Sequence, residues 1–306
     1  MAISCSGKKS NYRFTDYRFI ETKRHMPVRQ IVLNYQTKFE RLELKYLVNE
    51  QEASCIRRDI QNYCKPDRYN AQSRSHSNAD YGYPISSCYL DSPGMAFHKA
   101  KERGDPNRIK LRIRTYSPTS LASLEIKRRV SSIICKTRVA IDRQQTENAA
   151  RGLPVIGGPG MGDPGGAESL SVLSDFALVA GKSGAEPALT VEYDREAFES
   201  TVDRYARVTF DRKIRVQVAR DWMLTPKKDA WNNFNDYWAT QRSDTPVVLE
   251  LKCETTPPCW MVDLIQRHQL ALSSFSKYSI GVALCQENYG LGRSMGRRSL
   301  KAMEKK

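Results

Sequence analysis

The sequence predicts an α+β fold in which an antiparallel β-sheet closes into a barrel and helices pack outside it. Segments that alternate charged and aliphatic residues recur from residue 42 to residue 252. This period of two is typical of strands with one polar and one apolar face. Helical periodicity occurs in two further stretches, which begin near Asn49 and near Pro257.

The composition indicates a globular protein with an anionic partner. Of 306 residues, 40% are hydrophobic, and 49 Lys and Arg outnumber 34 Asp and Glu to give a net charge of +15. Such a charge suits nucleic acid, an anionic membrane surface or phosphates. The chain has no apolar run long enough for a membrane span, no signal-peptide core and no CxxC among its eight cysteines. We therefore expect a cytoplasmic protein without a zinc or disulfide framework.

The first elements in chain order are a strand and a capped helix. In "LELKY", residues 42–46, Glu43 and Lys45 share the face opposite the leucines. Asn49 is placed to cap a helix, and Glu52 occupies the capping-box position three residues later. An apolar stripe follows at helical spacing, so one face of this helix is predicted to pack in the core.

The stretch "RIKLRIRTY", residues 108–116, carries the clearest alternation. Strand geometry puts its aliphatic residues on one face and its cations on the other, namely Arg108, Lys110, Arg112 and Arg114. Such a strand can be a solvated edge strand whose Lys and Arg discourage aggregation. It can also be a face that receives a polyanion.

Six more segments show the same pattern and are predicted to be strands: residues 86–92, 124–130, 133–141, 188–195, 206–216 and 247–252. Gly and Pro dominate "RGLPVIGGPGMGDPGGAE", residues 151–168. This stretch is therefore predicted to be an internal loop between the strands of the two halves, and not a domain boundary. From Pro257 a helix is predicted, with Trp260, Leu264 and Ile265 on its packing face.

Charged residues occupy the polar face of almost every predicted strand. They are Glu43, Lys45, Arg112, Arg114, Glu125, Lys127, Lys136, Arg195, Arg207, Glu250 and Lys252. On an open sheet these faces would simply face water. If the sheet closes with them inward, it encloses a charged lumen. The cations of that lumen would repel one another without bound anions, so phosphate is the expected ligand.

Motifs along most of the chain carry a resemblance to a known family. They are "RLELKYLV", "SCYLDS", "IKLRIRTY", "LEIKRRV", "VEYDREAF", "VVLELK" and "FSKYSIGV". In this order they resemble the VTC domain, the polyphosphate polymerase module of the triphosphate tunnel metalloenzymes, which are related to the CYTH group of adenylate cyclases and triphosphatases. The similarity covers roughly residues 36–284.

The resemblance implies a basic tunnel inside the barrel, a divalent Mn²⁺ or Mg²⁺ ion, and transfer of the γ-phosphoryl group of ATP to a growing polyphosphate chain. By resemblance, the phosphate-binding catalytic cations are Lys45, Arg112, Arg114, Lys127, Arg195 and Arg207. Lys136, Tyr193, Ser276 and Lys277 are further substrate-binding residues, and Glu250 and Glu43 are the metal carboxylates. Lys252 joins the substrate-binding set because it shares a strand face with Glu250. Forked guanidiniums and a hard metal on a carboxylate are what phosphoryl transfer requires.

Two alternative functions stay open beside the polymerase. One is a triphosphatase or polyphosphatase of the same fold, which differs only in whether water or a phosphate chain reaches the phosphoryl group. The other is a non-catalytic module that binds polyphosphate or another polyanion, and two departures from the family pattern favour it: Arg41 stands where the CYTH triphosphatases have the first Glu of a Glu-x-Glu-x-Lys strand, and Ser273 and Ser274 stand where the family often has a further cation. The loss of that Glu removes one metal ligand and also favours the VTC domain over the CYTH triphosphatases.

The predicted organisation has three parts. Residues 1–35 form a basic, mobile N-terminal segment, residues 36–285 the VTC-like domain, and residues 286–306 a basic C-terminal tail. The expected ligands are ATP and inorganic polyphosphate or triphosphate. No recognition helix, zinc finger or RNP-like strand is present in the sequence, so no sequence-specific nucleic acid is expected. The sequence makes no prediction of the oligomeric state.

Overall fold

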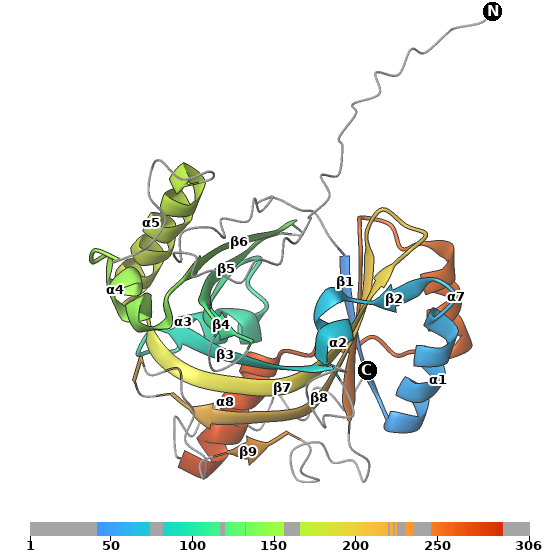
Figure 1. Ribbon diagram of the computed structural model, residues 1–306. Helices are drawn as coiled ribbons and strands as arrows, with labels where there is room; N and C mark the ends of the chain where they lie inside the picture. Colours follow the sequence, from blue (N-terminus) through green and yellow to red (C-terminus); the bar gives the residue numbers. More distant parts are fainter. Residues whose placement is uncertain are drawn as a thin grey trace, which may run out of the picture. The chain divides into compact units, whose positions relative to one another are not determined.

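A ten-stranded antiparallel sheet is the frame of the structure (Figure 1). The structure is a computed structural model, and it describes residues 42–73, 82–116, 120–131, 133–155, 166–219, 221–222, 224, 231–234 and 246–289. The predicted N-terminal segment, Arg41 and residues 290–306 of the predicted tail lie outside the described residues.

The strands alternate along the chain with short helices. The strands are β1 (Leu42–Val48), β2 (Cys64–Pro66), β3 (Tyr83–Asp91), β4 (Asn107–Thr115), β5 (Ala122–Val130), β6 (Ile133–Ile141), β7 (Glu186–Ser200), β8 (Ala206–Val218), β9 (Asn232–Asn233) and β10 (Val247–Cys253). Their order across the sheet is β1-β10-β8-β7-β3-β4-β5-β6, while β2 pairs with β7 and β9 pairs with β8. Each predicted strand therefore exists, and the predicted range 133–141 coincides with β6.

The helices are α1 (Glu50–Ile60), α2 (Arg68–Ser73), α3 (Ala96–Arg103), α4 (Thr146–Arg151), α5 (Gly166–Ser183), α7 (Cys259–Arg267) and α8 (Lys277–Tyr289), with one turn of 3₁₀ helix, η1 (Arg143–Gln145), before α4. The predicted capping box is confirmed, because Asn49 Oδ1 accepts from the Glu52 amide at 2.8 Å and Glu52 Oε2 accepts from the Asn49 amide at 2.7 Å. The predicted loop at residues 151–168 is wrong at both edges, because Arg151 ends α4 and residues 166–168 begin α5. Residues 152–155 are neither helix nor strand, and residues 156–165 lie outside the described residues. None of the described helices is long and apolar enough to cross a membrane.

The predicted closed barrel is wrong. Within the described residues, β1 and β6 are the two ends of the sheet, and no backbone pairing joins them. Figure 1 shows the sheet curving between these ends. A side chain crosses the gap, since Lys127 Nζ on β5 lies 3.1 Å from Glu43 Oε2 on β1. Alternation predicts which face of a strand is polar, whereas closure depends on strand tilt and stagger, which alternation does not encode.

Helices cover the aliphatic outer face of the sheet. The fully buried Ile56 and Ile60 of α1 and the buried Trp260 and Leu264 of α7 pack with Leu249 of β10. On the other half of the sheet, α5 packs against β5 and β6, with Phe176 fully buried in the cluster that holds their aliphatic side chains. The side chains that alternate with these aliphatic residues lie on the opposite face, called the inner face below.

The helix α8 packs differently, because it lies against the inner face. Ser87, Val191 and Arg114 are neighbours in the strand register, so they share that face. Val191 packs in one cluster with Val282 of α8, and the ring of Tyr278 stacks on Tyr89 with centroids 4.8 Å apart. The apolar part of the inner face is therefore buried by α8, whose first residues meet the charged part.

Gly82, directly before β3, allows a close approach to a strand that carries site residues. It has a φ of +68°, and a Cβ at this position would lie 1.8 Å from the Arg195 carbonyl oxygen. Gly82→Ala is expected to lower the free energy of unfolding by about 3 kcal/mol through this clash and the unfavourable φ. Denaturant unfolding measures the change. Gly94→Ala is the matched control, because a Cβ there meets nothing within 4 Å; equal losses for the two variants would contradict the prediction.

Candidate functional site

The inner face gathers cations and carboxylates in rows that cross neighbouring strands. Lys45 on β1 stands beside Glu250 on β10, and Glu43 stands beside Lys252 in the next row. Lys252 in turn is beside Arg207 on β8. Cross-strand neighbours have Cβ atoms about 5 Å apart, so opposite charges in these rows are within ion-pair reach.

Glu250 lies at the centre of the largest cluster. Only 5% of its surface is exposed, and four cations surround its carboxylate. The distances to its oxygens are 2.7 Å from Lys252 Nζ, 3.5 Å from Arg195 Nη2, 3.5 Å from Lys277 Nζ and 3.7 Å from Lys45 Nζ. Burial opposes the charge on Glu250, but these cations outweigh that cost and hold its pKa well below the ordinary value.

Asp211 is a second buried carboxylate in this cluster, and the sequence analysis missed it. Its oxygens lie 2.7 and 2.8 Å from Arg195 Nε and Nη2 and 2.5 Å from Lys277 Nζ. A signal was available in "ARVTFDRK", because Asp211 alternates with Arg207 along β8. Asp211 is fully buried, so its charge depends on these two cations.

Glu125 on β5 anchors another group of cations. It is 1% exposed, and its two oxygens lie 2.5 Å from Arg112 Nε and 2.8 Å from Lys136 Nζ. Burial lowers the pKa of Lys136 to about 7, with Arg112 and Arg114 adding to the effect and Glu125 opposing it. The Lys136 side chain is 37% exposed, so solvent reaches it within this crowded face.

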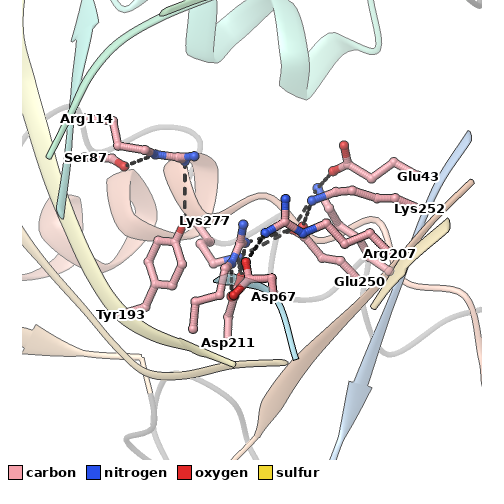
Figure 2. A network of polar contacts seen from close by, with 12 residues as sticks. Glu43, Asp67, Ser87, Arg114, Tyr193, Arg207, Asp211, Glu250, Lys252 and Lys277 are labelled. Carbon is pink, nitrogen blue, oxygen red and sulfur yellow. Dashed lines mark hydrogen bonds and ion pairs between the residues drawn. The ribbon is translucent and has the colours of Figure 1, made fainter. Parts of the chain in front are cut away.

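Arg114 and Tyr193 contact each other on the inner face, beside the Glu250 cluster (Figure 2). Arg114 donates to Ser87 Oγ at 3.2 Å and to the Tyr193 hydroxyl at 3.4 Å. The Lys277 Nζ lies 4.8 Å from the centroid of the Tyr193 ring. In the described part of the chain, no carboxylate forms an ion pair with Arg114. Its guanidinium charge is therefore available to pair with an anionic ligand.

Lys110 is a second cation without a carboxylate partner among the described residues. Its Nζ donates to Ser276 Oγ at 3.1 Å, and Ser276 Oγ also accepts from the Ser279 amide at the first turn of α8. Burial lowers the pKa of Lys110 well below the ordinary value, and the nearby Lys45 and Lys127 add to the effect. Lys110 shares the inner face with Arg112 and was not among the predicted site residues.

Arg207 is held by a residue far from it in sequence. It contacts Asp67, whose carboxylate also accepts from the Tyr83 hydroxyl at 3.1 Å and from the Asn70 amide at 2.8 Å. Asp67 is 2% exposed and caps the short helix α2. No periodic pattern marks it in the sequence, so only the fold brings it to Arg207.

Every predicted site residue lies on the inner face or at the start of α8. The Glu250 cluster brings together Glu43, Lys45, Arg195, Lys252 and Lys277, and Lys127 joins it through Glu43. The remaining predicted residues, Arg112, Arg114, Lys136, Tyr193, Arg207 and Ser276, lie in the groups described above. Their roles stay predictions.

The predicted metal carboxylates, Glu43 and Glu250, both contact Lys45, at 2.7 and 3.7 Å. Within the described ranges, no group of three or more His, Cys, Asp or Glu side chains is placed to hold a metal ion. Mg²⁺ is usually held by one or two carboxylates together with waters and substrate phosphates. Two neighbouring carboxylates on a phosphate-attracting face fit that kind of binding.

Comparison with known proteins identifies the family. A family model of the VTC domain matches residues 40–286. The chain belongs to the VTC domain family. This membership supports a function on triphosphate or polyphosphate and implies dependence on a divalent metal. No curated protein sequence matches the chain.

Solved structures similar to this VTC domain include two candidate cyclases. One, a candidate adenylate cyclase from Bacillus halodurans, is 11% identical with a TM-score of 0.41, over 79% of this chain and 96% of that one. The other, a candidate adenylyl cyclase from Hippeastrum for which a dominant triphosphatase activity is described, is 12% identical with a TM-score of 0.41, over 80% and 96%.

Lys136 gives the site a testable pH dependence. With a pKa of about 7, its amine is mostly neutral at about pH 8, and a bound phosphate would raise that pKa. Triphosphate binding is therefore expected to take up protons at this pH, and affinity is expected to fall as pH rises above 7. Titration calorimetry in two buffers of different ionisation enthalpy measures the uptake. Lys136→Arg keeps the charge but cannot titrate, so it should reduce the uptake; unchanged uptake would contradict the assignment to Lys136.

Proposed function

We propose that this VTC domain is a metal-dependent polyphosphate polymerase, which transfers the γ-phosphoryl group of ATP to a polyphosphate chain bound along the inner face. The observation that carries the proposal is the charge arrangement of this face. Its buried carboxylates Glu125, Asp211 and Glu250 each contact at least two cations. Arg114 and Lys110 have no carboxylate partner among the described residues. Such a face attracts a linear chain of phosphates in preference to a single anion.

The guanidiniums would bind the chain and spread its charge. Arg112, Arg114 and Arg195 present planar forks that match the nonbridging oxygens of phosphates. Arg112 pairs with Glu125 and Arg195 with Asp211, so their charge is partly directed to these carboxylates. A bound phosphate can share these cations because Arg112 and Lys136 remain 19% and 37% exposed. Binding is therefore an exchange of ion-pair partners on a face that is already organised.

Glu43 and Glu250 would hold the divalent metal, Mn²⁺ or Mg²⁺. A bound divalent ion would neutralise charge that develops on the transferred phosphoryl group. Lys45, which contacts both carboxylates, would then turn toward the phosphates. The acceptor is a phosphate oxygen of polyphosphate that is already ionised near neutral pH, so the protein need not provide a general base.

The direct test is to incubate the purified protein with Mn²⁺ and ATP and to follow polyphosphate and free phosphate separately. Growing chains with little free phosphate would support the polymerase. Release of free phosphate without chains would replace it with a hydrolase of the same site. Tight binding of polyphosphate without either product would leave only a binding module.

Arg114 tests phosphate binding without disturbing a carboxylate pair. Arg114→Ala is expected to weaken tripolyphosphate binding by about tenfold to a hundredfold, because a charge-assisted hydrogen bond contributes about 1.5–3 kcal/mol. Calorimetry measures the affinity, and the melting temperature verifies folding. The matched control is Arg128→Ala on the same half of the sheet, since Arg128 pairs with Asp175 of α5 on the outer face at 2.7 Å. Unchanged affinity in folded Arg114→Ala would place the phosphates elsewhere.

A polyanion-binding module is the second candidate, and the environment of Glu250 favours it. The four cations around this carboxylate neutralise it without a metal. Glu250 could therefore serve to keep the cations of the inner face from repelling one another. The two functions differ in what the loss of its charge would do.

Glu250→Gln separates these functions. If Glu250 holds the metal, the variant loses Mn²⁺-dependent turnover while metal-free polyphosphate binding persists or tightens, because one negative charge has gone. Turnover, metal-free affinity and melting temperature are measured on the same preparation. Glu192→Gln is the control, because Glu192 pairs with Arg215 on the outer side of the sheet at 2.7 Å. Full Mn²⁺-dependent activity in Glu250→Gln would refute the metal role.

A further inference from the structure

Three tyrosines form a cluster of rings at one end of the inner face. The rings of Tyr69 and Tyr116 are stacked, with centroids 5.7 Å apart and planes 6° from parallel. Tyr83 lies tilted against both, at 5.6 Å from Tyr69 and 6.4 Å from Tyr116. These three residues are called the tyrosine cluster. They come from α2, from the start of β3 and from the residue after β4.

The cluster is contiguous with the phosphate-binding cations. Tyr83 is the cross-strand neighbour of Arg195, and its hydroxyl donates to Asp67, which contacts Arg207. Tyr116 follows Arg114 by two residues, and its contact with Tyr83 puts both rings on the inner side. An anion bound to these arginines would therefore end beside aromatic rings.

The outermost ring remains open to solvent. Tyr69 is 46% exposed although it belongs to a stacked pair, whereas Tyr83 is 7% exposed. The guanidinium carbon of Arg68 lies 5.8 Å from the Tyr69 ring centroid and adds positive charge at the same place. A rigid, partly exposed aromatic surface next to phosphate-binding arginines has the chemistry of a base-stacking platform.

We propose that the tyrosine cluster binds the base of a nucleoside triphosphate whose phosphates lie along Arg207, Arg195 and Arg114. This inference rests on the proposed function, because it assigns a place to the nucleoside of the phosphoryl donor. Stacking uses the face of the ring, which every base presents, so the cluster favours nucleotides over inorganic triphosphate without selecting one base strongly. A cluster that only packs α2 against the sheet would not discriminate between the two ligands.

The experiment compares two ligands with the same number of phosphates. Calorimetry with ATP and with tripolyphosphate, both without metal, gives the ratio of their dissociation constants. Tyr69→Ala is expected to weaken ATP binding by about tenfold, the size of one lost base–aromatic stack, and to leave tripolyphosphate binding unchanged. Tyr69→Phe should bind both ligands as the unsubstituted protein does, because the ring remains.

Tyr63→Ala is the matched control. Tyr63 is also exposed, at 38%, and its ring stacks on Trp260 of α7 on the outer side of the sheet with centroids 5.3 Å apart. This variant should change neither affinity. An equal loss for ATP and tripolyphosphate in Tyr69→Ala, or no loss for either, would overturn the base site while leaving the phosphate site intact. Failure of the unsubstituted protein to bind tripolyphosphate would instead overturn the proposed function, and the base site with it.

Discussion

Buried carboxylates hold the inner face together. Its lysines and arginines come from strands that are neighbours in the sheet, where like charges would repel one another in a partly desolvated space. Glu250, Glu125 and Asp211 are each almost fully buried, and each is placed among cations that keep it ionised. Removing one partner of such a pair leaves an uncompensated buried charge, so the sheet can carry this surface only with its acids in place.

The same pairs prepare the face for a ligand. Because the carboxylates orient the guanidinium and ammonium groups before any anion arrives, little reorganisation is needed on binding. The pKa values of Lys110 and Lys136 are lowered, because burial and neighbouring cations oppose the charge of each lysine, and at Lys136 they outweigh the attraction of Glu125. A phosphate bound at these two positions would favour the charged form of each lysine, which burial disfavours.

Helices complete the face from both ends. At one end α8 buries the apolar part of the inner face and presents Ser276 and Lys277 to the charged part. Tyr278 fixes this helix, because its hydroxyl donates to the buried Asp91 at 2.6 Å, and Asp91 also accepts from the amides of Phe97 and His98 in the first turn of α3. At the other end Asp67 and α2 hold Arg207 and bring in the tyrosine cluster. Asp67 and Asp91 thus accept hydrogen bonds from amides at the starts of α2 and α3, and the same two carboxylates help to position Arg207 and α8.

The sequence by itself determined the strands, their polar faces and the capped helix α1. Period-two alternation fixes which side chains share a face, and a capping box is local, so Lys45, Arg112 and Glu250 could be placed on one face without coordinates. The family motifs supplied the roles proposed for them. Only the tertiary structure decided that the sheet stays open, because the pairing of β1 with β6 depends on strand tilt and stagger. It alone joined Asp67 to Arg207, Lys110 to Ser276 and Tyr69 to Tyr116, because these contacts link residues far apart in the chain and no periodic pattern records them.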